Sequence, residues 1–97
     1  MWITTVTSDL FAIRALDEVD AIALYESIQS KKNELRAIDG AGNSTAEYPA
    51  VDDYSTIPLG QASLIVKRAW NQQTNAQAFV DHLAGISHVT ATLEEQA

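Results

Sequence analysis

The chain has 97 residues, of which 46% are hydrophobic and 20% charged, so it has the length and composition of one compact domain and not of a disordered chain. Thirteen acidic and six basic residues give a net charge of −7, which disfavours nucleic acid and anionic membranes as partners. The absence of cysteine excludes disulfides, thiol nucleophiles and cysteine-ligated zinc.

The first segment, Trp2 to Val6, is predicted to be an N-terminal strand that turns back through the next three residues. Residues 8–16 admit two interpretations. The heptapeptide LFAIRAL at 10–16 shares Leu, Arg and Ala at equivalent places with LIVKRAW at 64–70, which favours a strand. The alternative is a short helix that starts at Ser8.

A helix is predicted to begin after Asp17, which is a suitable N-cap. Glu18 and Asp20 place negative charge in the first turn, where it complements the helix dipole. One broad apolar face is formed by Ala21, Ile22, Leu24, Tyr25 and Ile28. Residues 33–39 either continue this helix or form a strand, and the polar break at 31–33 favours the strand.

Residues 40–60 are predicted to form a long acidic loop, because they contain three of the four glycines, both prolines and no basic residue. Loops of this length are commonly functional or disordered. Tyr48 and Tyr54 give the loop apolar material to bury against the domain or a partner. Asp52 and Asp53 are adjacent loop acids of the kind that is usually solvated, so no metal site is assigned to them.

The clearest pattern spans Ala62 to Glu95 and predicts a strand, a helix and a second strand. Thr74 and Gln77 have the spacing of a capping box, so the helix is expected over Asn75 to Ala84. Its apolar face consists of Ala76, Phe79, Val80 and Leu83. Gly85 is predicted to end the helix in the left-handed conformation. The second strand alternates the apolar residues Val89, Ala91 and Leu93 with His88, Thr90 and Thr92.

Together the two halves predict a single α+β domain over residues 1–97. Two βαβ units joined in sequence give a ferredoxin-like βαββαβ sandwich, in which both helices cover one face of a four-stranded antiparallel sheet. Trp2 to Val6 adds an extra N-terminal strand to this arrangement.

No pattern marks a catalytic, cofactor-binding or metal site, and no cofactor is expected. The two histidines, His82 and His88, do not have the spacing of a zinc pair, although a lone histidine base stays an alternative. Arg68 and Trp70 lie on one face of their strand, which suits a cation–π contact, whereas the basic charge and aromatic motifs of RNA-binding sheets are missing. The candidate interface residues are Arg68, Trp70, Tyr48 and Tyr54.

Two segments resemble bacteriophage proteins. Arg68 to Asn71 followed by Ala76 to Asp81 resembles small phage proteins of unknown role, in which an Arg-x-Trp strand end precedes an Ala-Gln-rich helix. The opening MWIT at 1–4, with Asp9 and Leu10, resembles the start of phage head–tail connector proteins. The inferred strand and helix order also resembles the antibiotic-biosynthesis monooxygenase and stress-responsive barrel families.

The hypothesis that follows is a non-enzymatic structural or protein-interaction protein, phage or prophage encoded, that acts as a homodimer. The dimer is predicted to form through the uncovered sheet face, with Trp70 buried only in the dimer and the 40–60 loop folded across its rim. The alternative is a dimeric ferredoxin-like enzyme or small-molecule binder whose closed apolar pocket contains His82 or His88. Because Met1 to Asp9 lacks the pattern of a signal peptide, a cytoplasmic location is expected, or a virion-associated one for a phage protein.

Overall fold

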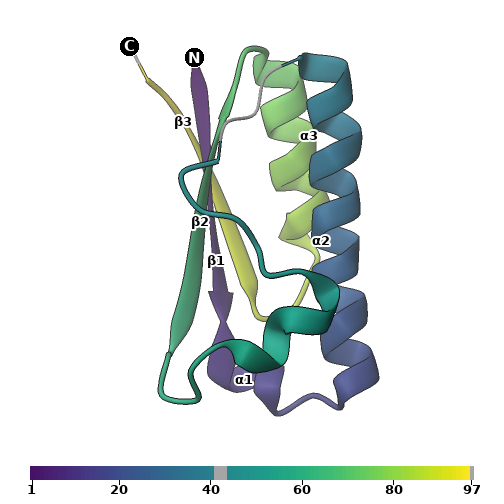
Figure 1. Ribbon diagram of the computed structural model, residues 1–97. Coiled ribbons are helices and arrows are strands. Elements are labelled where there is room, and N and C mark those ends of the chain that lie inside the picture. The colour runs from purple at the N-terminus through teal and green to yellow at the C-terminus, as the bar shows by residue number, and fades with distance from the viewer. Residues whose placement is uncertain (41–43, 97) are drawn as a thin grey trace.

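A computed structural model describes residues 1–40 and 44–96 as two layers, a sheet and a pair of long helices that cover one of its faces (Figure 1). This arrangement confirms the α+β class. In chain order the elements are β1 (Trp2–Asp9), α1 (Leu10–Arg14), α2 (Glu18–Asp39), the 3-10 helix η1 (Val51–Thr56), β2 (Ser63–Trp70), α3 (Gln73–Ala84) and β3 (Val89–Glu95).

The sheet has the strand order β2-β1-β3, and β1 is antiparallel to both neighbours. Val6 in the middle of β1 lies between Val66 of β2 and Ala91 of β3. The strands β2 and β3 therefore run parallel to each other, and α3 connects them across the intervening β1. The predicted N-terminal strand and the predicted strand, helix and strand of the second half are confirmed.

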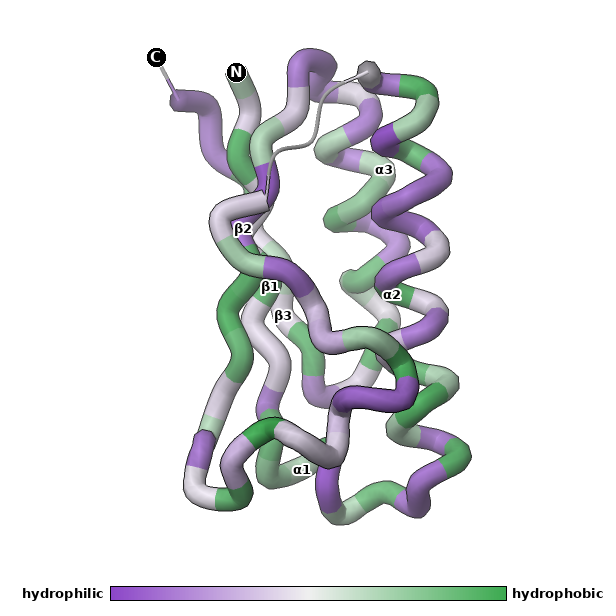
Figure 2. The backbone as a smooth tube through the Cα atoms, viewed as in Figure 1, coloured by the Kyte–Doolittle hydropathy of each residue, from purple (hydrophilic) through white to green (hydrophobic). Residues whose placement is uncertain are grey.

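The core lies between the sheet and the two helices. The strands supply Val6, Val66, Trp70 and Val89, and the helices supply Tyr25, Ile28, Leu35, Ala76, Phe79 and Leu83. The Trp70 ring lies 5.6 Å from the Phe79 ring, and its indole N–H donates to Thr4 Oγ1 at 3.0 Å. Hydrophobic and hydrophilic residues alternate along α2, as expected for a helix with one buried face (Figure 2).

The prediction of a strand at 33–39 is wrong, because α2 continues without a break to Asp39. Its buried face includes Ile28, Lys32, Leu35 and Asp39, at intervals of three or four residues. Two of these four positions carry charge, so the apolar pattern is interrupted after Ile28 although the helix continues. The fourth strand of the ferredoxin-like sandwich is absent from the described residues, whose sheet has three strands.

The prediction of a strand at 10–16 is also wrong. The backbone leaves β1 at Asp9 and enters α1 directly, and the Asp9 carboxylate accepts from the backbone N–H of Ala12 at 3.1 Å. Leu10 and Ile13, one helical turn apart, are the buried residues of α1. The short helix considered as the alternative therefore exists, two residues later than expected and with an aspartate cap.

Both ends of α3 differ from the prediction. Its N-cap, Gln72, makes no side-chain capping bond, and Gly85 has a φ of −94° and is not left-handed. The capping is provided from α2 by Asp39, whose carboxylate accepts from the backbone N–H groups of Asn71 at 2.7 Å and Gln72 at 3.0 Å. One carboxylate thus joins the end of α2 to the beginning of α3.

Residues 44–60, here called the strap, lie against the domain. Ser44 forms an antiparallel bridge with Arg68, so the strap begins along the outer edge of β2. Tyr48 is buried in the core, and its ring lies 6.1 Å from the ring of Tyr25. The Arg14 guanidinium donates to the carbonyl of Ile57 at 2.6 Å and to two further strap and turn carbonyls. The strap is therefore fixed at its start, its middle and its end.

Candidate functional site

No helix among the described residues covers the sheet face turned away from α2 and α3 (Figure 1). We call it the open face. Its side chains are Ile3, Thr5 and Thr7 of β1, Ile65, Lys67 and Ala69 of β2, and Thr90, Thr92 and Glu94 of β3. These residues alternate with the buried residues of the same strands, as the pleat of a sheet requires.

Threonines form the centre of the open face. Thr5 lies opposite Thr92, and Thr7 lies opposite Thr90 and, on the other side, Ile65. Ile65 is 51% exposed, so a large apolar side chain lies beside these threonines in contact with solvent. The centre of the face is weakly polar, with methyl groups beside hydroxyls, and burying this centre requires little desolvation of charge.

Two hollows indent the open face, one at each end. The upper hollow has a volume of about 330 Å³, and its lining includes Ile3, Lys67 and Glu94. The lower hollow has a volume of about 510 Å³, and its lining includes Phe11 and His88. Phe11 is 57% exposed, so an aromatic ring stands beside the lower hollow without an intramolecular cover.

His88 adopts a φ of +70°, the left-handed region that residues other than glycine rarely occupy. Its carbonyl accepts from the backbone N–H of Asp9 at 2.8 Å, which joins the start of β3 to the end of β1. The Asp9 carboxylate is engaged in the cap of α1. The histidine therefore borders the lower hollow on the outside of the sheet and not in the space between the sheet and the helices.

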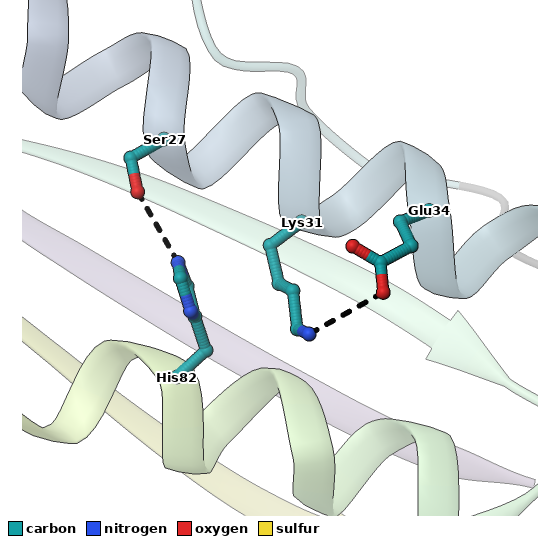
Figure 3. A network of polar contacts seen from close by, with 4 residues as sticks. All are labelled: Ser27, Lys31, Glu34 and His82. Atoms are coloured by element: carbon teal, nitrogen blue, oxygen red, sulfur yellow. Dashed lines mark hydrogen bonds and ion pairs between the residues drawn. The ribbon is translucent and has the colours of Figure 1, made fainter.

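The second histidine, His82, lies on the outer side of the helical layer (Figure 3). Its Nε2 is 3.2 Å from Ser27 Oγ, a contact that links α3 to α2 beside the Lys31–Glu34 ion pair. A serine beside a histidine is the pair that hydrolases use, but such sites also need a group that orients the histidine and donors for an oxyanion. Among the described residues no hydrogen bond holds His82 Nδ1. The pair is an interhelical link.

The structure places three of the four predicted interface residues inside the chain. Arg68, Trp70 and Tyr48 are 2%, 0% and 3% exposed, and Tyr54 is partly buried. The expectation that Trp70 is buried only in a dimer is wrong, because the face that carries Trp70 is the one covered by the helices. The cation–π contact is present, since Arg68 Cζ lies 5.9 Å from the centre of the Trp70 ring.

Three buried hydroxyl groups near the strap make no hydrogen bond within the described part of the chain. They belong to Ser8, Tyr25 and Tyr48. Burial raises the pKa of both tyrosines above the ordinary value. Ser8 is close enough to Tyr48 to oppose part of its pKa shift, but the two oxygens do not have hydrogen-bond geometry. Sequence reasoning did not find this group, because burial of a single serine and two tyrosines leaves no pattern.

Residues 1–40 and 44–96 contain no group of three side chains arranged to hold a metal ion. In the same residues no helix has the length and apolar character needed to cross a bilayer. No protein-family model, no curated protein and no solved structure matches the chain.

Proposed function

We propose that this protein is a non-enzymatic interaction module that forms a homodimer through the open face. The observation that carries the proposal is the contrast between the two faces of one sheet. The helices and the strap cover one face, while the other exposes Ile65 among threonines and has Phe11 at its lower end. Ile65 and Phe11 are thus exposed apolar side chains on an uncovered face, and burial against a second surface would remove them from water.

The charges of the open face support a second copy as the occupant. Lys67 lies on β2 at one edge, and Glu94 lies on β3 at the opposite edge. A two-fold axis parallel to β1 places the β2 edge of one copy over the β3 edge of the other, so each lysine approaches the partner copy's acidic edge. Such a patch is self-complementary, which is what a two-fold interface requires.

The setting proposed for the module is a phage or prophage. Its support is the resemblance of Arg68 to Asn71 and Ala76 to Asp81 to small phage proteins, together with a fold that offers a binding surface and no assembled catalytic centre among the described residues. A cytoplasmic or virion-associated location and a further protein partner belong to the same proposal.

Charge reversal tests the dimer directly. Lys67→Glu brings acids together across the proposed interface, and we expect it to convert a dimer of twice the 10.6 kDa chain mass into a monomer in light scattering. The double variant Lys67→Glu with Glu94→Lys restores opposite charges and should restore the dimer. Lys31→Glu, on the helical side, is the matched control and should leave the dimer intact. A wild-type chain that is monomeric at high micromolar concentration would refute the proposal.

The small-molecule alternative has one observation in its favour, which is that His88 borders the lower hollow. Its predicted pocket between helices and sheet is replaced by core side chains such as Phe79 and Leu83. A fragment screen followed by nuclear magnetic resonance would decide this alternative. Ligands that shift the resonances of Thr7, His88 and Thr90 together would support this alternative. If no ligand shifts any of these resonances, the alternative is refuted.

A further inference from the structure

Two basic side chains are buried between α2 and β2. Lys32 lies on the sheet-facing side of α2 and is 4% exposed, and Arg68 lies on the helix-facing side of β2 and is 2% exposed. Arg36 follows Lys32 one helical turn later and is exposed. We call these three residues the basic cluster. It holds half of the six basic residues of a chain whose net charge is −7.

The two buried cations are held differently. Arg68 is engaged, since its Nη2 donates to Ser44 Oγ at 2.6 Å and its guanidinium lies against the Trp70 ring. Lys32 has no hydrogen bond and no ion pair among residues 1–40 and 44–96. Its sequence neighbour Lys31 does have a partner, Glu34, at 3.5 Å. The stem of Lys32 is buried, but its ammonium is not among the fully buried polar atoms, so it reaches solvent at the surface. An accessible ammonium that no described side chain pairs with is open to an anion.

The charges around Lys32 do not balance it. Burial, Arg68 and Arg36 lower the pKa of the Lys32 ammonium, and Glu47 is the acid that opposes this shift. Burial and Arg36 likewise lower the pKa of Arg68. Glu47 is exposed and makes no ion pair with Lys32. Three positive charges therefore face a single carboxylate that acts from a distance.

We propose that the basic cluster binds a small oxyanion of the phosphate class, between α2 and the beginning of the strap. Lys32 supplies ammonium donors, Arg36 supplies a guanidinium at the solvent side, and Arg68 supplies fixed positive charge. Ser44 accepts from Arg68 and keeps its own hydroxyl proton for an anion oxygen. Guanidinium groups match the oxygen geometry of phosphate, which favours this anion over chloride.

The site lies on the helical side of β2, because Arg68 points to that side and Lys32 and Arg36 lie on α2. Arg68 also borders the upper hollow, at the edge of the open face. Arg36 and Glu47, the charged residues that act on both Lys32 and Arg68, are exposed. An anion bound here would join Lys32 of α2 to Ser44 of the strap. Binding is thus expected to stabilise the monomer fold, whatever its state of association.

Thermal unfolding with inorganic phosphate tests the proposal, at constant ionic strength kept by sodium chloride. A dissociation constant near 1 mM would give a rise in melting temperature of roughly 7 °C at 10 mM phosphate. Arg36→Met, at an exposed position, should weaken phosphate binding about tenfold in calorimetry, which is the effect of losing one charge-assisted hydrogen bond. Lys31→Met removes the same charge one turn away and should leave the affinity within twofold.

Lys32→Met tests whether Lys32 binds the anion or is buried only for packing. If the lysine binds the anion, the variant folds and loses its melting response to phosphate, while the general salting effect of phosphate persists in every variant. Phenyl phosphate run in parallel distinguishes a free ion from a phosphate ester by which of the two binds more tightly. A wild-type protein without a phosphate-dependent shift, or equal losses in Arg36→Met and Lys31→Met, would overturn the proposal.

Discussion

The two faces of the sheet are built from the same three strands and from similar residues, yet one is core and the other surface. On β1, Thr4 and Ser8 are completely buried, whereas Thr5 and Thr7 point to the open face. Threonine therefore occurs on both faces of the sheet. The difference is set by the helices, which cover the face that carries Val66 and Trp70. Which side of a strand becomes core depends on what the rest of the chain can place against it.

The largest test of this comparison is Phe79→Ala. Phe79 is 2% exposed and packs on Trp70 of the covered face, so its removal should lower the free energy of unfolding by about 3–5 kcal/mol. Gln77, on the outside of the same helix, bonds only to Asp81, and Gln77→Ala should cost under about 0.5 kcal/mol. Urea denaturation measures both, and equal losses would contradict the assigned helix face.

Adjacent substitutions on β2 compare the two faces most directly. Val66→Ala removes buried methyl groups from the covered face and should cost about 2 kcal/mol. Ile65→Ala acts on the open face, and in the monomer it should cost about 0.5 kcal/mol or less. For self-association we expect the opposite order. Ile65→Ala should weaken the dimer more than Val66→Ala does, because Ile65 lies on the proposed interface. Denaturant melts at low concentration and light scattering at high concentration separate the two effects.

The cap supplied by Asp39 should come next in size. Asp39→Ala removes the acceptor of two backbone N–H groups and of the Asn75 side chain, and we expect a loss of about 1–2 kcal/mol. Thr74→Ala changes the residue that the capping-box pattern singled out, and it should cost under about 0.5 kcal/mol because that box is not formed. A larger loss in Thr74→Ala than in Asp39→Ala would refute the assigned cap.

The smallest effect is expected at Tyr48. Its buried hydroxyl lacks a hydrogen bond among the described residues, so Tyr48→Phe should raise stability by up to about 1 kcal/mol at neutral pH. The raised pKa means that the folded chain keeps the phenol proton above pH 10, where the unfolded chain has lost it. Stability should therefore fall as the pH rises above 10, and Tyr48→Phe should make this fall shallower. Melting temperatures between pH 8 and 11 would show the difference.

The second half of the chain was predictable because its elements follow simple periods. Leu64 to Val66 is an unbroken apolar run, and Phe79 and Leu83 recur at helical spacing. In the first half, the strand at Trp2 to Val6 and the helix start after Asp17 were predictable. Residues 33–39 were not, because charges occupy core positions there. Lys32 and Asp39 interrupt the apolar face of α2. Asp39 is buried because its carboxylate accepts from the start of α3, which comes much later in the chain.

The candidate surfaces were predictable only in part. Alternation along β2 correctly separates Val66 and Trp70 from Ile65, but the pattern does not say which group meets the helices. The basic cluster was not foreseen, since Lys32 and Arg68 lie far apart in sequence and charge alone marks neither as buried. Only the packing of α2 on the sheet brings them together.

The central position of β1 has a consequence for how the chain folds. The first strand to be synthesised pairs with two strands that come much later, and Trp2 lies opposite Trp70 on one side and Glu95 on the other. During translation α2 can form as soon as it leaves the ribosome, but β1 stays without either neighbour until most of the chain has emerged. Loop closure of this range slows folding. We expect the ribosome-bound chain to expose β1 for nearly the whole of its synthesis, which makes that strand the natural target of a chaperone.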